Sequence, residues 1–178
     1  WSSDVCSSDL LRHYEILFEC LPEIVITKDG IEAVTKDLVY NAKKYRFFDD
    51  AIAVIPELSE KFDMAVVSDA WPSLRHVFIS NDFMDYFKSF VVSCELGICK
   101  PDKRMYLKAV EELGFDIQEV VFVDDRLKNC DGARDAGIIS TYLMCRSNVE
   151  YWFSKITVRN HIIVKNFNQI KVHLEKRS

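Results

Sequence analysis

Polar side chains follow three short apolar segments of this chain. Ser68 ends the segment MAVVS and is followed by Asp69. Lys100 lies in GICKPD, after the segment SFVVS. Asp124 ends the segment VVFVD and is followed by Asp125. A hydroxyl and an ammonium group can hold and neutralise phosphoryl oxygens. Hard carboxylate oxygens can hold Mg2+, which needs few protein ligands. These residue types together point to phosphoryl transfer.

Each residue also has a structural reading. Ser68 could end a strand or cap a helix, Lys100 could be an ordinary surface lysine, and the acidic pair could favour the start of the next helix. Adjacent carboxylates repel each other, however, and such a pair at a buried strand end usually needs a cation. Polar residues follow all three segments, and one shared site explains this better than three unrelated structural roles do.

The segments themselves indicate buried parallel strands, because they are short, rich in β-branched residues and apolar throughout. The five expected strands are MAVVS (64–68), SFVVS (89–93), VVFVD (120–124), ISTYL (139–143) and HIIV (161–164). Expected helices are at about 51–61, 73–79, 102–113, 127–136 and 167–175. This alternation predicts an open α/β sheet with right-handed crossovers, whose functional site lies at the carboxyl ends of the strands.

Residues 11–45 follow a different pattern. Apolar residues recur there at helical spacing on both sides of a break at Pro22 and a turn at Asp29-Gly30. Two helices without an intervening strand suggest an appendage. We therefore expect a partial helical cap at 11–45 and an α/β core at 46–178.

Composition excludes several classes of protein. The formal net charge is −5 without a basic cluster, so we expect no nucleic acid partner. No apolar run approaches the roughly 20 residues that span a membrane, so we expect no membrane partner. The scattered cysteines include no CxxC pair, which argues against zinc and favours reduced thiols in a cytoplasmic protein. They are Cys6, Cys20, Cys94, Cys99, Cys130 and Cys145. Nothing in the sequence indicates the oligomeric state.

The order Ser, Lys-Pro, Asp-Asp-x-x-x-Asn closely resembles the haloacid dehalogenase-like (HAD) hydrolase superfamily. The resemblance runs from about Phe47 to Leu143 and rests on AVVSDA, GICKPDKRMY and VVFVDDRLKNCDGARDAGI. It implies a three-layer, Rossmann-like core with a parallel sheet and a small helical cap. The implied activity is Mg2+-dependent hydrolysis of a small phosphorylated metabolite through an aspartyl-phosphate intermediate.

The resemblance also implies a role for each residue. Ser68 would bind a phosphoryl oxygen, and Lys100 would neutralise charge and orient the nucleophile. Asp125 would ligate Mg2+, and Asp124 would support the metal or its waters. Two further residues, Asn129 and Asp69, would lie behind the residues that touch metal and substrate. Asp69 departs from the family, because many members have Asn or Gly there.

The first family motif, DxDx[TV], supplies the nucleophile and the general acid/base, and this chain has no Asp-x-Asp before Ser68. Asp4 and Asp9 lie five residues apart in WSSDVCSSDL, a segment that matches the translation of a common sequencing adapter. We therefore expect residues 1–10 to be non-native, to follow no helix or strand pattern and to bury little. We also expect the first strand to be missing, which would leave a gap between 64–68 and 120–124 or bring those strands together. This chain itself is then expected to be inactive.

Other functions fit less well. Carbon–halogen hydrolysis in the same superfamily needs no metal, and the resembling dehalogenases carry a Ser-rich fourth motif in place of Asp124-Asp125. Phosphomutase and phosphonatase chemistry stay open. A receiver-type signalling domain would have its acidic pair before the hydroxyl and the lysine, and here the pair follows them. A catalytically dead binding module is the alternative outside the enzymes, and no GxGxxG supports a dinucleotide enzyme.

Overall fold

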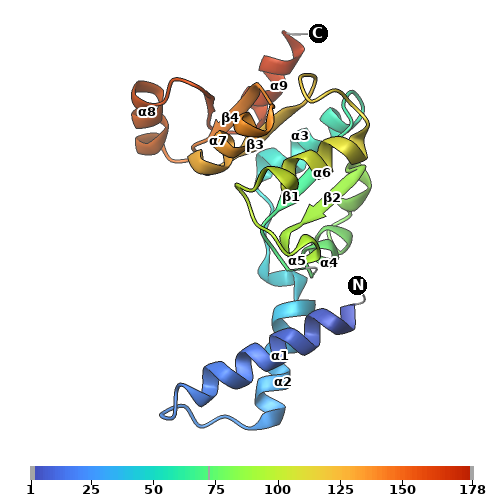
Figure 1. Cartoon of the computed structure of the whole chain (residues 1–178), viewed down its shortest axis with the longest axis vertical. Coiled ribbons are helices and arrows are strands. Elements are labelled where there is room, and N and C mark those ends of the chain that lie inside the picture. The colour runs from blue at the N-terminus through green and yellow to red at the C-terminus, as the bar shows by residue number, and fades with distance from the viewer. Residues whose placement is uncertain (1–2, 72, 177–178) are drawn as a thin grey trace. The chain divides into compact units, whose positions relative to one another are not determined.

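The computed structural model describes residues 3–71 and 73–176 of the chain (Figure 1). The fold divides into two compact units. The first gathers the described residues of Trp1–Arg46 with those of Ala70–Met84, and the second comprises Phe47–Asp69 and Asp85–Ser178. In the described part of the chain, no helix is both long enough and apolar enough to cross a membrane.

The first unit is helical. It holds α1 (Ser3–Glu19), α2 (Lys28–Tyr40), the short 3-10 helix η1 (Ala42–Lys44) and α4 (Ser73–Ile79). Leu10 of α1 packs against Val39 of α2, and both side chains are buried. Thr27 begins α2 as its N-cap, because its hydroxyl accepts a hydrogen bond from the Gly30 N–H group at 3.1 Å.

Residues 3–10 form no strand of the core, as we expected, but the expectation that no helical pattern fits this segment was wrong. Helix α1 already begins at Ser3, and Leu10 is only 2% exposed. Once the apolar residues after Leu10 have formed a helix, each preceding residue adds one hydrogen bond and costs little, so the helix extends towards the N-terminus. Trp1 and Ser2 lie outside the described residues. Whether 1–10 are non-native stays a prediction, as do the boundaries 11–45 and 46–178.

The second unit contains five parallel strands in its described residues. β1 (Ala65–Ser68) pairs with β2 (Ser89–Val92), and β4 (Ser140–Met144) lies between β3 (Val121–Asp124) and β5 (Ile162–Val164). The α-helices are α3 (Asp49–Ser59), α5 (Ser93–Leu96), α6 (Lys103–Leu113), α7 (Leu127–Ala136), α8 (Asn148–Thr157) and α9 (Phe167–Glu175). A 3-10 helix, η2 (Met84–Tyr86), precedes β2.

Helices cover the strands, as the sequence predicts. α6 packs against β1 and β2, α7 packs against β3 and β4, and α3 packs against α9 (Figure 1). The core beneath α6 and α7 includes Tyr106, Phe122 and Ala133, and partly buried Val67 of β1 packs against it. On the α9 side, Tyr142 and Val164 pack against Ile170. The second unit is therefore a layered α/β core, which confirms the predicted fold class.

The sheet is interrupted between β1 and β3. Among the described residues, β1 forms a ladder only with β2, and β3 only with β4. We expected either a gap or a collapse between these two strands, and the structure has the gap. One edge of β1 and one edge of β3 therefore lack a ladder partner at the centre of the unit.

Candidate functional site

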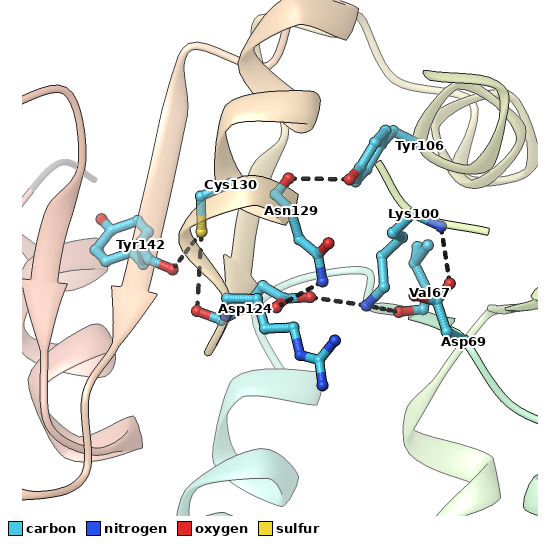
Figure 2. Close-up of polar contacts among 9 residues, drawn as sticks. Val67, Asp69, Lys100, Tyr106, Asp124, Asn129, Cys130 and Tyr142 are labelled. Carbon is cyan, nitrogen blue, oxygen red and sulfur yellow. Dashed lines mark hydrogen bonds and ion pairs between the residues drawn. The ribbon is translucent and has the colours of Figure 1, made fainter. Parts of the chain in front are cut away.

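Lys100 connects the two sides of the interrupted sheet. Its ammonium group donates to the carbonyl oxygen of Val67 in β1 at 2.9 Å and to Oδ2 of Asp124 in β3 at 2.7 Å (Figure 2). The lysine and aspartate side chains are only 10% and 6% exposed. One buried cation therefore ties the carboxyl ends of two strands that share no ladder.

Local sequence explains how Lys100 reaches this position. Its backbone N–H group donates to Oδ1 of Asp69 at 2.8 Å, which fixes the loop before α6 to the residue that follows β1. Pro101 follows, and Asp102 begins α6 as its N-cap by accepting from the Arg104 N–H group at 3.0 Å. The cap sets the start of the helix, and Lys100, two residues before the cap, is held over the strand ends.

Asp124 is fully engaged by donors of the protein. Its Oδ1 accepts from the Arg126 N–H group at 2.8 Å and from Nδ2 of Asn129 at 3.0 Å, while Oδ2 faces Lys100. Asn129 is 2% exposed and lies in the first turn of α7. The helix after β3 thus holds the Asp124 carboxylate in one orientation.

Tyr106 supports Asn129 from the opposite helix. The tyrosine hydroxyl donates to the main-chain oxygen of Asn129 at 2.9 Å, and its ring meets Phe122 edge-on with centroids 5.1 Å apart. Burial raises the pKa of Tyr106, and the negative charge of Asp124 raises it further. The hydroxyl therefore stays protonated and keeps donating.

Cys130 reinforces the same turn of α7. Its thiol donates to the main-chain oxygens of Asp124 at 3.8 Å and Tyr142 at 3.6 Å, as Figure 2 shows. Burial raises the pKa of Cys130 to about 12, and the Asp124 charge acts in the same direction. This cysteine is therefore a structural thiol, and it is no nucleophile at neutral pH.

The structure brings together four of the six predicted residues, namely Asp69, Lys100, Asp124 and Asn129. Ser68 and Asp125 lie at the same strand ends, with Ser68 half-buried and Asp125 exposed. In the described part of the chain, neither side chain has a hydrogen-bond partner. That these two side chains share one crevice with Lys100 stays a prediction.

The oxygens present fit a magnesium ion only in part. Asp124 already uses both carboxylate oxygens, whereas the exposed carboxylate of Asp125 accepts no hydrogen bond among the described residues. Oδ1 of Asn129 is buried without a donor within the described residues, so one hard oxygen beside Asp124 is uncommitted. No cluster of three or more His, Cys, Asp or Glu side chains suited to a metal occurs in the residues described. Mg2+ can accept one or two carboxylates when water and substrate supply the rest.

Sequence reasoning missed Val67 and assigned no roles to Tyr106 and Cys130. Val67 takes part through its main-chain carbonyl, so its side chain carries no signal. Tyr106 did carry one, because it ends the KPD-x-x-x-Y pattern. Cys130 follows Asn129 directly in a helix that begins just after the acidic pair.

Comparison with known proteins supports a hydrolase. The haloacid dehalogenase-like hydrolase family matches residues 14–137, well over half of the chain. A glyceraldehyde 3-phosphate phosphatase from Methanopyrus kandleri is 28% identical over 138 residues, covering 72% of this chain and 57% of the relative. The chain thus spans less than two thirds of that phosphatase.

Solved structures share the fold at low sequence identity. The Bacillus subtilis HAD-hydrolase YfnB, bound to magnesium, aligns with a TM-score of 0.69 at 16% identity, covering 97% of this chain and 80% of its own. The L-2-haloacid dehalogenase of Xanthobacter autotrophicus aligns with a TM-score of 0.68 at 15% identity, covering 89% and 71%. Both likenesses show the Rossmann-like α/β fold.

Proposed function

Because the chain belongs to the haloacid dehalogenase-like hydrolases, we propose that it is the greater part of a Mg2+-dependent phosphatase that acts on a small phosphorylated metabolite. The observation that carries this proposal is the Lys100 ammonium group, held at 2.9 Å from Val67 of β1 and 2.7 Å from Asp124 of β3. A cation fixed at the open end of an interrupted sheet is suited to neutralising phosphoryl oxygens.

The remaining residues would act around that cation. Ser68, at the end of β1, would donate its hydroxyl to a phosphoryl oxygen. Asp125 would hold Mg2+, which would neutralise charge on the phosphoryl group. Asp124 would keep Lys100 in place, and Asn129 and Asp69 would fix the orientation of that pair.

This chain has no Asp-x-Asp to supply a nucleophile. We propose that an upstream strand ending in Asp-x-Asp lies in the gap between β1 and β3 in the active protein. Its first carboxylate would attack phosphorus and release the alcohol, and water would then hydrolyse the aspartyl phosphate. Without that strand, the chain would show no covalent turnover.

The second candidate is dehalogenation, which is favoured by the likeness of the fold to haloacid dehalogenases such as the Xanthobacter enzyme. The paired carboxylates after β3 argue against it, because that reaction needs no metal. The Methanopyrus relative is a phosphatase, which supports a phosphate ester as substrate. Which ester is hydrolysed depends on a cap of which this chain holds a part.

The test compares this chain with a version extended upstream by its own gene sequence, or by a strand ending in Asp-x-Asp-x-Thr. Hydrolysis of p-nitrophenyl phosphate is measured with and without Mg2+. We expect turnover only in the extended protein and only with Mg2+. Lys100→Ala and Asp125→Ala in the extended protein should each abolish it.

Lys108→Ala is the matched control. Lys108 lies on the exposed face of α6, where it pairs with Glu111 at 3.1 Å, so its removal should leave turnover unchanged. Mg2+-dependent turnover by the unextended chain that is lost in Asp125→Ala would show that the nucleophile has been misassigned. Release of chloride from 2-chloropropionate by the extended protein, without phosphatase activity, would establish the dehalogenase instead.

A further inference from the structure

Helix α8 exposes an uninterrupted apolar stripe. Val149, Trp152, Phe153 and Ile156 are 83%, 63%, 66% and 69% exposed, and their spacing of three and four residues places them on one face. We define these four side chains as the α8 stripe. The catalytic proposal gives this stripe no role.

The helix that carries the stripe is firmly attached on its other side. Ser154 is buried and accepts from the Cys145 thiol at 3.5 Å, and Tyr151 packs against the cluster formed by Cys130, Leu143, Cys145 and Ile163. Ser147 caps the helix by accepting from the Glu150 N–H group at 3.1 Å. The stripe is therefore the outward face of an anchored helix.

We propose that the α8 stripe is a homodimer interface, in which two copies of the chain pair their α8 helices antiparallel about a twofold axis. The stripe is symmetric about the point between Trp152 and Phe153. An antiparallel partner therefore places Trp152 opposite Phe153 of the other copy and Val149 opposite Ile156. Apolar groups meet apolar groups at every level, and the helix dipoles oppose each other favourably.

Charge and area favour a second copy over other occupants. The charged residues of α8, Glu150 and Lys155, flank the stripe at helical angles that keep them out of an antiparallel contact. An anionic membrane is disfavoured, because the helix has no net charge and the chain carries −5. Aromatic side chains bring about 150–250 Å2 each, so two stripes would bury on the order of 1,000 Å2 together. That area is at the lower limit for a specific interface, about 1,000–1,200 Å2, so a weak dimer is expected.

Sedimentation equilibrium on the full chain tests this proposal between about 1 and about 200 µM, the range in which a small interface should dissociate. We expect the wild type to be dimeric at the upper end and monomeric at the lower end. Trp152→Glu and Phe153→Lys should each be monomeric throughout. Phe115→Glu is the matched control, since Phe115 is 45% exposed elsewhere in the second unit, and it should dimerise as the wild type does.

Mixing the two monomeric variants tests the antiparallel geometry. The carboxylate introduced at position 152 of one copy would then face the ammonium group introduced at position 153 of the other. The opposite pair, Phe153 of the first copy and Trp152 of the second, stays aromatic, so a heterodimer should form. Circular dichroism checks folding, and the milder Ile156→Ser variant, with weakened dimerisation expected, serves if a charged variant unfolds.

Several results would overturn the proposal. These are a wild type that stays monomeric at the highest concentration, a dimer that persists unchanged in Trp152→Glu, and a mixture that does not associate. Co-flotation of the monomer with phosphatidylcholine–phosphatidylserine vesicles, lost in Trp152→Glu, would assign the stripe to membranes instead.

Discussion

The pair formed by Lys100 and Asp124 is the most buried ion pair described in this chain, and its stability should depend on having both partners. Removing one partner of a buried pair leaves an uncompensated charge. We expect Lys100→Met to lower the free energy of unfolding by about 3 kcal/mol. Urea denaturation followed by circular dichroism measures this change.

A second substitution separates charge from packing. Lys100→Met combined with Asp124→Asn removes both charges and keeps acceptors for Arg126 and Asn129, so most of the lost stability should return. The exposed pair between Lys88 and Asp63 is the control, and Lys88→Met should cost less than about 1 kcal/mol. An equal loss at Lys88 and Lys100 would contradict the importance of burial.

Asp50 should make the stability of the second unit depend on pH. Burial alone would raise its pKa, but hydrogen bonds from the Arg146 guanidinium and the Phe167 N–H group, both at 2.8 Å, and the Arg146 charge lower it overall. A lowered pKa in the folded state stabilises the fold above the unfolded pKa, near pH 4. This stabilisation is lost as pH falls through the lower, folded pKa.

Asp50→Asn removes this titration. We therefore expect the free energy of unfolding to fall less steeply between about pH 5 and pH 2 in the variant than in the wild type. Urea denaturation at several pH values measures the two slopes. Glu60→Gln, on an exposed residue just after α3, serves as control and should leave the slope unchanged. Parallel curves for wild type and Asp50→Asn would refute the prediction.

At the scale of elements, α7 approaches the loop that carries Lys100 too closely for any side chain at Gly132. A Cβ atom there would lie 2.5 Å from Cβ of Pro101 and 3.0 Å from the Tyr106 hydroxyl. We expect Gly132→Ala to lower the free energy of unfolding by about 1–3 kcal/mol, because the loop or the helix must shift. In the extended protein it should also reduce turnover, since Lys100 lies next to Pro101.

Asp135→Ala, on the exposed face of the same helix, is the control. It should change stability by no more than about 0.5 kcal/mol, as surface helix substitutions usually do. Denaturation curves for the two variants give the comparison. A Gly132→Ala protein as stable as Asp135→Ala would show that the close approach is tolerated.

The strands and helices of the core could be predicted because the apolar pattern within each segment indicates the element that the segment forms. All five expected strands are present within a residue or two, and α4, α7 and α9 begin and end at the predicted residues. Helix α8 was missed, although its apolar residues recur at helical spacing. It connects the parallel strands β4 and β5, so the strand-helix alternation leaves room for it, but its apolar face points outwards instead of onto the sheet. The start of α1 was missed because helix propagation, rather than its own pattern, extends it to Ser3.

Part of the candidate site could be predicted as well. Strand ends in a parallel sheet meet at one edge, so Lys100 and Asp124 could be grouped from their positions after the strands, and Asn129 was added through the family resemblance. The contact with Val67 could not, because a main-chain carbonyl is available at any residue. The Val67 carbonyl accepts from Lys100 at the edge of β1 that has no ladder partner among the described residues. That open edge depends on how the whole sheet assembles.

At the scale of the whole molecule, the two units differ in how much apolar surface they bury. The first unit's described core cluster consists of Leu10, Val39 and the partly buried Leu38. The second contains several clusters, including the one around Tyr106 and Phe122 and the one around Tyr142. Burial of apolar surface is the main stabilising contribution, so the second unit should be the more stable.

Hydrogen exchange can resolve this difference without separating the units. We expect the amides of α1 and α2, corrected for intrinsic rates, to exchange about tenfold or more faster than those of α7 and β4, because a difference of 1–2 kcal/mol in opening free energy changes populations 5–30-fold. Within the second unit, β4 should be best protected, since it has ladder partners on both sides, while β1 and β3 each have one. Mass spectrometry of peptides from these elements measures the rates. Uniform protection across α1, α2 and α7 would show that the chain opens as one cooperative unit, and protection of β1 equal to β4 would show that the edge facing the interruption is covered.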